Sequence, residues 1–85
     1  MFTIEYQRDA LRTLQRMPRN VARRIRDKIE ALALDPAAPN NNVKKLVDRP
    51  GYRLRVGDWR VIYDIEHGRL VIRVLAVAPR GGAYQ

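Results

Sequence analysis

The stretch YRLRVGDWRVIYDIEHGRLVIRVLAVAPRGGAY, residues 52–84, decides the fold of this chain. Residues 52–56 and 59–65 alternate apolar with polar side chains, and residues 70–77 are apolar on both faces except at one arginine, so each segment is typical of a β-strand. Gly57-Asp58 and His67-Gly68 separate the three segments, and short glycine-containing links of this kind close antiparallel hairpins. The stretch therefore predicts a three-stranded antiparallel meander.

Arginines occupy polar positions of the first two predicted strands. Because side chains alternate between the two faces of a strand, Arg53 and Arg55 must leave the same face, and Arg60 joins them if the register allows. Like charges side by side on a sheet lower stability, so such a cluster indicates an anionic ligand. The alternative is that these arginines only form the solvent-exposed side of a half-buried sheet, and both interpretations stay open at this point.

The first half of the chain predicts one strand and two helices. Residues 2–6 alternate apolar with polar side chains, which favours a strand. From about residue 8 the apolar residues recur at helical spacing as far as Met17, and Pro18 interrupts the pattern. A second apolar stripe predicts a helix that ends near Leu34, and its members are Val21, Ala22, Ile25, Ile29, Leu32 and Ala33. The arginines around this second helix are interpreted as its solvated face.

We expect a single α+β domain over residues 1–85. It consists of an N-terminal strand, a helical hairpin and the three-stranded antiparallel meander. Each helix has one apolar face and the sheet needs one face covered, so the helices should pack on one face of a four-stranded sheet. Residues 43–51 lead into the meander, and Lys44 and Lys45 within them are either phosphate contacts or solubilising loop residues.

Composition limits the class of protein. Eighty-five residues form one small core, which by general scaling buries about two-thirds of the surface of the unfolded chain. The chain has no cysteine, so neither disulfides nor thiolate metal sites are expected, and a reducing compartment is predicted. No apolar run reaches about 18 residues and the first residues do not resemble a signal peptide, so we expect a cytoplasmic protein without membrane contact.

The charge balance points to an anionic partner. The chain holds 17 basic and 9 acidic residues, a net charge of +8, and 14 of the 17 basic residues are arginines. The planar guanidinium matches phosphate oxygens two at a time, which favours nucleic acid or an acidic protein as partner. Residues 1–42 hold 8 basic and 5 acidic residues, a surplus of 3, and residues 43–85 hold 9 and 4, a surplus of 5. The surplus is therefore larger in the half that contains the meander.

Most familiar catalytic motifs are absent from the sequence. It contains no glycine-rich phosphate loop, no GxSxG and no carboxylate cluster suited to a divalent metal, so neither a metal nor a cofactor is expected. His67, the single histidine, falls in a predicted hairpin turn, where we interpret it as a turn residue. One histidine also excludes a ribonuclease mechanism that needs a pair of histidines.

The order of these elements resembles the RelE/ParE superfamily of bacterial and archaeal toxins. The resemblance covers essentially the whole chain, and its most specific parts are the hairpin YRLRVGDWRVIYDI and the ending VAPRGGAY. Basic residues at the positions that act on RNA in RelE toxins make the match closer to the RelE branch. The resemblance implies a type II toxin that enters the ribosomal A site and cuts messenger RNA. It also implies a cognate antitoxin that holds the toxin inactive, with a toxin–antitoxin heterotetramer as the expected assembly.

The resemblance implies a catalytic set of five residues. In a metal-independent cleavage the ribose 2′-oxygen attacks the adjacent phosphorus, and Arg53 and Arg60 would stabilise charge on the nonbridging oxygens. Arg80 would lie near the leaving 5′-oxygen and Tyr84 would stack on or orient a base. Arg55 stands where RelE toxins have a lysine that is a candidate general base. An arginine, with a pKa above about 12, releases its proton very reluctantly, so the base stays unassigned.

Two other functional classes stay open. One is a ParE-like inhibitor of DNA gyrase, in which the arginine face need not be catalytic. The other is a basic module that binds nucleic acid or an antitoxin without catalysis. The arginines together with the tail tyrosine favour the ribonuclease over the gyrase inhibitor. Three further residues are predicted RNA contacts, namely Lys44, Lys45 and Arg73.

Overall fold

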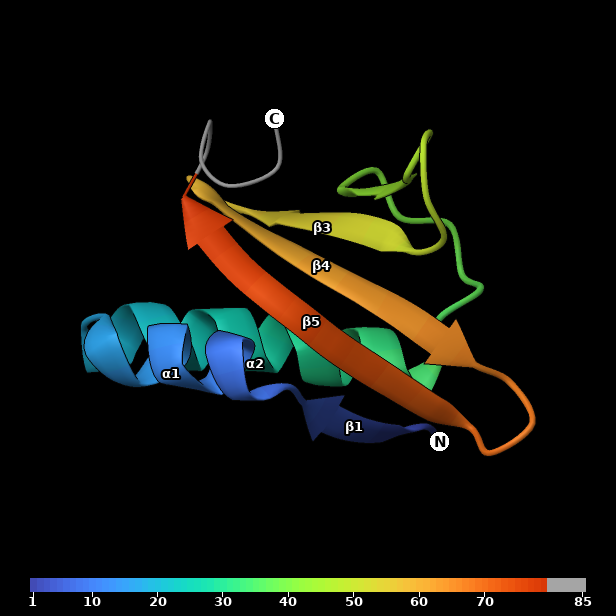
Figure 1. The fold of residues 1–85 in the computed structure, drawn as a ribbon, viewed down its shortest axis with the longest axis horizontal. Coiled ribbons are helices and arrows are strands. Elements are labelled where there is room, and N and C mark those ends of the chain that lie inside the picture. The colour runs from blue at the N-terminus through green and yellow to red at the C-terminus, as the bar shows by residue number, and fades with distance from the viewer. Residues whose placement is uncertain (80–85) are drawn as a thin grey trace.

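The computed structural model of the chain describes residues 1–79. Its elements are β1 Thr3–Tyr6, α1 Arg8–Arg16, α2 Arg19–Leu34, β2 Val43–Lys45, β3 Tyr52–Val56, β4 Trp59–Glu66 and β5 Val71–Pro79. Both helices lie on the same side of one mixed β-sheet (Figure 1). The predicted α+β class, with a helical hairpin on one face of a sheet, is confirmed.

The sheet has the strand order β1-β5-β4-β3-β2. The neighbouring pairs from β5 to β2 are antiparallel, as the meander requires, whereas β1 runs parallel to β5. The sheet thus contains five strands and not the four expected from the sequence, because Val43–Lys45 pairs with β3. Three residues are too few to show an alternating pattern, and the pairing is held by long-range bonds such as Arg55 N donating to the Asn42 carbonyl at 2.8 Å.

The helices end where the sequence predicts, and proline is the cause at their junction. Met17 takes an extended conformation, which the residue before a proline favours. The Pro18 carbonyl accepts hydrogen bonds from the amides of Val21 and Ala22 and so starts α2. Neither helix of the described residues has both the length and the apolar character needed to cross a membrane.

The side chains that point from the sheet toward the helices form the core. Leu54, Val61 and Val74 come from three neighbouring strands and are almost fully buried with apolar residues of both helices. Tyr63 belongs to the same layer and stacks on Tyr52 with ring centroids 5.5 Å apart. Burial raises the pKa of the Tyr63 hydroxyl to about 12. The side chains at the alternate positions project from the other side of the sheet. We call this side the open face and define it by Arg53, Arg55, Arg60, Ile62, Asp64 and Arg73.

Candidate functional site

Four basic side chains gather at one end of the open face. The register of β3 and β4 sets Arg55 directly opposite Arg60, and the register of β2 and β3 sets Lys44 opposite Arg53. All four line a single hollow of about 270 Å³, whose lining is completed by Asn41 and Asn42. We call Lys44, Arg53, Arg55 and Arg60 the basic cluster. The structure thus brings together three of the five residues of the predicted catalytic set.

The basic cluster has no counter-charge within the described residues. Among residues 1–79 no ion pair joins any of its four members to a carboxylate. The residue opposite Arg53 on β4 is Ile62, and the residue opposite Arg60 on β5 is Ala78, so the cross-strand neighbours of the cluster are either apolar or basic. Arg55 and Arg60 therefore repel each other across the β3–β4 pair without compensation. Fixed cations beside apolar residues create a positive potential that attracts an anion.

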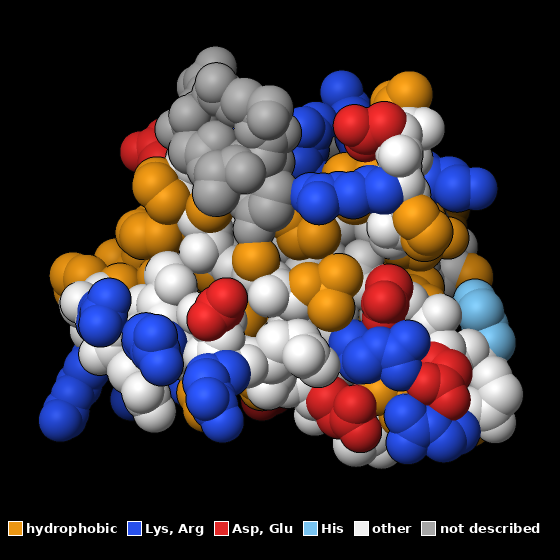
Figure 2. Space-filling view, in the orientation of Figure 1, with side chains coloured by type: hydrophobic (Ala, Val, Ile, Leu, Met, Phe, Trp, Pro, Cys, Tyr) orange, Lys and Arg blue, Asp and Glu red, His pale blue; other side chains and the backbone are white. Residues whose placement is uncertain are grey.

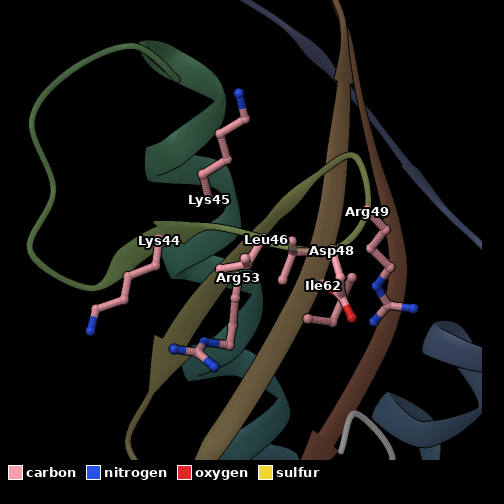
Figure 3. Close-up of a pocket in the computed structure, with 8 residues that line it drawn as sticks. Lys44, Lys45, Leu46, Asp48, Arg49, Arg53 and Ile62 are labelled. Atoms are coloured by element: carbon pink, nitrogen blue, oxygen red, sulfur yellow. The ribbon is translucent and has the colours of Figure 1, made fainter.

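A larger cleft of about 500 Å³ adjoins the basic cluster (Figure 3). It is lined by Lys45 at the end of β2, by residues 46–49 of the loop between β2 and β3, and by Ile62 of β4. Lys44 and Arg53 line both this cleft and the hollow. Lys45 points away from Lys44 and Arg53 (Figure 3), because successive residues of a strand leave opposite faces. Of the two predicted lysine contacts, only Lys44 thus belongs to the basic cluster.

One glycine allows the loop to close against the sheet. The amide of Leu46 donates to the carbonyl of Gly51 at 3.0 Å, which joins the two ends of the loop. Gly51 has a φ of 113°, and a Cβ at this position would lie 2.9 Å from the carbonyl oxygen of Tyr63. Only glycine fits this backbone conformation without strain. The loop that lines the cleft therefore depends on Gly51.

The opposite end of the open face is neutralised by carboxylates, and Figure 2 shows acidic and basic side chains interleaved there. Arg73 Nε lies 3.0 Å from Oδ1 of Asp64, which stands opposite it on β4, and Arg73 Nη1 donates to Glu66. Arg69 Nη2 also donates to Glu66, at 3.0 Å, and Arg69 Nη1 lies 4.0 Å from Glu5. Hydrogen bonds from Arg69 and then Arg73 lower the pKa of Glu66 to about 2. We call these five residues the paired end, and Arg73 is thereby outside the basic cluster.

The remaining predicted site residues, Arg80 and Tyr84, lie outside the described residues 1–79. The described chain reaches Pro79 opposite Trp59, one residue beyond Ala78, which stands opposite Arg60. Pro79 therefore lies at the same end of the sheet as the basic cluster.

His67 takes no part in the basic cluster. It lies in the turn between β4 and β5, at the paired end, with its ring edge-on to Phe2 at 6.1 Å. Within residues 1–79 no group of three or more histidine, aspartate or glutamate side chains is placed to hold a metal ion. No sequence pattern indicates Ile62, Asn41 and Asn42 as lining residues, because the hollow and the cleft depend on how β2 and its loop pair with β3.

Comparisons with known proteins agree with this fold. The family described as ParE toxin of type II toxin-antitoxin system, parDE, matches residues 4–84. A RelE-like toxin protein of Escherichia coli is 23% identical over 79 residues, which cover 93% of this chain and 83% of that protein.

Solved structures show the same arrangement. A chain of the archaeal RelE–RelB complex from Pyrococcus horikoshii OT3 is 30% identical with a TM-score of 0.81, covering 96% of this chain and 98% of that chain. The isolated RelE toxin of Escherichia coli is 17% identical with a TM-score of 0.80, covering 99% of this chain and 89% of that chain. At 17% identity the likeness to the second structure concerns the fold alone.

Proposed function

The chain belongs to the ParE toxin family, within the RelE/ParE superfamily of type II toxins, and on this premise we propose that it is a ribosome-dependent messenger RNA endoribonuclease. The membership confirms the resemblance that the hairpin and the ending of the sequence carry. Cleavage within the A site and the resulting arrest of translation are the finer part of the proposal.

The observation that carries the proposal is the basic cluster. Three guanidiniums from two strands surround one hollow, and no carboxylate of residues 1–79 neutralises them. In the proposed reaction the ribose 2′-oxygen attacks the adjacent phosphorus in line and the bond to the 5′-oxygen breaks, leaving a 2′,3′-cyclic phosphate and a 5′-hydroxyl. Arg53 and Arg60 stabilise the negative charge that grows on the nonbridging oxygens, a contribution of roughly 10² to 10³ in rate per well-placed donor.

Arg55 contributes positive charge in this proposal and does not act as the base. It is exposed and directly opposite Arg60, so it can approach the same phosphate. A guanidinium keeps its proton in proteins, so it is a poor acceptor for the 2′-proton. We therefore place the proton acceptor outside the described residues, with the ribosome aligning the 2′-hydroxyl. This requirement gives a physical reason for ribosome dependence.

The tail completes the proposed site. The described chain ends at Pro79 beside the basic cluster, and Arg80 and Tyr84 follow it in sequence. We assign the Arg80 guanidinium to the charge on the leaving 5′-oxygen and the Tyr84 ring to stacking on a base, the common way to hold single-stranded RNA. Lys44 and the cleft under the loop would hold the adjoining nucleotides by their phosphates.

The solved structures of related toxins support a cognate antitoxin as the partner of this chain. Solved relatives include RelE–RelB complexes from Pyrococcus horikoshii and Escherichia coli. We propose that the antitoxin of this chain shields the basic cluster, and that toxin and antitoxin form a heterotetramer. Both the ribosome and the antitoxin would be met in the cytoplasm, which is the compartment we propose.

Inhibition of DNA gyrase is the second candidate, and the match to the ParE toxin family favours it. In that case the basic cluster would be a binding surface and the arginines would take part in no chemistry. A non-catalytic basic module would likewise bind RNA or antitoxin and leave RNA intact.

Mapping RNA ends on ribosomes decides among these candidates. The purified protein is added to ribosomes paused on a defined message, and we expect a cut within the A-site codon that leaves a 5′-hydroxyl end. Intact message together with arrested supercoiling by gyrase would move the assignment to the gyrase inhibitor. Intact message with unaffected gyrase would leave the binding module.

A further inference from the structure

Helix α1 carries a second set of uncompensated cations. Arg8, Arg12 and Arg16 follow one another at intervals of four residues and all three are exposed. We call them the helix ridge, and Figure 2 shows a row of basic side chains along α1. The helices lie on the opposite side of the sheet from the open face (Figure 1), so the helix ridge and the basic cluster belong to different layers of the molecule.

The helix ridge serves no packing role in the domain. The core contacts of α1 come from Ala10 and Leu14, which are almost fully buried. Within residues 1–79 no ion pair joins the three arginines to a carboxylate, although Asp9 stands in the first turn of the same helix. Like charges four residues apart destabilise a helix, and a cation in the first turn also opposes the helix dipole. The helix dipole favours Arg16 in the last turn but not Arg8 in the first, and no ion pair of residues 1–79 relieves the repulsion along the ridge, as is expected of a binding surface.

The chemistry of the ridge fits a nucleic-acid backbone better than a protein. Four residues of α-helix rise about 6 Å, comparable to the separation of successive phosphates along one strand of RNA. Guanidiniums bind phosphate in a bidentate manner. The centre of a protein interface is usually apolar, whereas the large exposed apolar residues within residues 1–79 are Met1, Leu34, Val47 and Leu70, none of them on α1.

We propose that the helix ridge binds the phosphate backbone of double-helical RNA, independently of the basic cluster. Base-paired RNA hides its base edges in a deep, narrow groove, so a row of guanidiniums reads its backbone and not its sequence. The two basic surfaces then have separate ligands: single-stranded RNA at the basic cluster and duplex RNA at the helix ridge. On a ribosome the ridge would hold the domain against structured RNA while the message enters the open face.

Binding to a short RNA hairpin with a stable stem tests this inference without any cleavage readout. Fluorescence anisotropy over a range of salt concentrations gives the slope of log K against log salt. For the triple variant Arg8→Gln, Arg12→Gln and Arg16→Gln we expect the slope to be less steep by about 2 to 3, one phosphate contact being lost per arginine. Thermal unfolding of the variant checks that the fold is kept.

A matched control removes the same charge from the other helix. Arg23, Arg24 and Lys28 are exposed on α2, and their triple change to glutamine should leave the slope within about 1 of the wild-type value. An equal loss of slope in both variants would reduce the effect to net charge and overturn the inference. An unchanged slope in the α1 variant, with weakened binding to polyglutamate, would identify an acidic protein as the ligand and would overturn it as well. Failure of RNA cleavage on ribosomes would leave this result untouched.

Discussion

At one end of the open face Arg73 lies between Asp64 and Glu66, and at the other end Arg55 faces Arg60 with no carboxylate of residues 1–79 paired to either. The two ends share strand β4, the same face of the pleated sheet and the same residue type. They differ in the residues that the register sets beside each arginine. Arginines that the sheet neutralises support the sheet, and arginines that it leaves uncompensated remain available to an outside anion.

The register of β4 and β5 creates this division. Between Ile62 and Tyr63 the pairing shifts by one residue, and beyond the shift Asp64 stands opposite Arg73. Without the shift Asp64 would stand opposite Val74. Arg73 would then project from the face that packs on the helices, because a shift of one residue exchanges the two faces of a strand. The irregularity thus separates a neutralised half of the open face from a cationic half.

The largest expected effect separates the two ends by activity. In the A-site cleavage assay, Arg60→Ala and Arg53→Ala should each lower the rate roughly 10² to 10³-fold, because each removes a donor to the charged transition state. Arg69→Gln, which removes a cation from the paired end, should leave the rate within about tenfold of wild type. Circular dichroism establishes that all three variants fold. Full activity of both alanine variants would refute the assignment of the basic cluster.

A smaller effect concerns stability. It is tested with a substitution that places a carboxylate within the basic cluster. Arg55→Glu places a carboxylate opposite Arg60, so repulsion becomes attraction, and we expect the free energy of unfolding to rise by about 0.5 to 1 kcal/mol. Arg55→Gln, which only removes the repulsion, should give a smaller rise. Urea unfolding measures both, and a glutamate variant less stable than the glutamine variant would contradict this description of the cluster. RNA cleavage by the glutamate variant should fall.

How much of this could be predicted from sequence depends on the range of the interactions. The helical periodicity on both sides of Pro18 predicts the two helices. The alternation from Tyr52 onward predicts the meander and the position of Arg53 and Arg55 on the same face. These features arise between residues close in sequence. The three-residue strand β2, the parallel pairing of β1 and the register shift in β4 depend on contacts between distant segments, which no local pattern encodes.

The same limit explains the outcome for the individual site residues. The sequence predicts Arg73 as an RNA contact, and the carboxylate partners of Arg73 become visible only when β4 is placed beside β5. The lysines at positions 44 and 45 were predicted as equivalent, and the strand formed by Val43–Lys45 sends them to opposite faces. The roles of Arg80 and Tyr84 stay predictions.

The smallest effect belongs to the paired end and depends on pH. The pKa of Glu66 is lowered from 4.5 to about 2, so its ion pairs stabilise the folded state fully above the unfolded value and are lost as the pH falls through that interval. Urea unfolding of wild type should therefore show a loss of stability between pH values of about 4.5 and about 2. Glu66→Gln should be less stable at neutral pH and should show less of this loss. Identical pH profiles for the two proteins would mean that the ion pairs contribute nothing.

The most direct test of the division between the two ends is an NMR titration of the arginine side chains. With ¹⁵N-labelled protein and a short single-stranded RNA that carries a 2′-deoxy block against cleavage, the Nε–Hε signals of all arginines are followed individually. We predict that the signals of Arg53, Arg55 and Arg60 shift on binding, while those of Arg69 and Arg73 stay in place. Shifts confined to Arg69 and Arg73, with the basic cluster unchanged, would contradict the account.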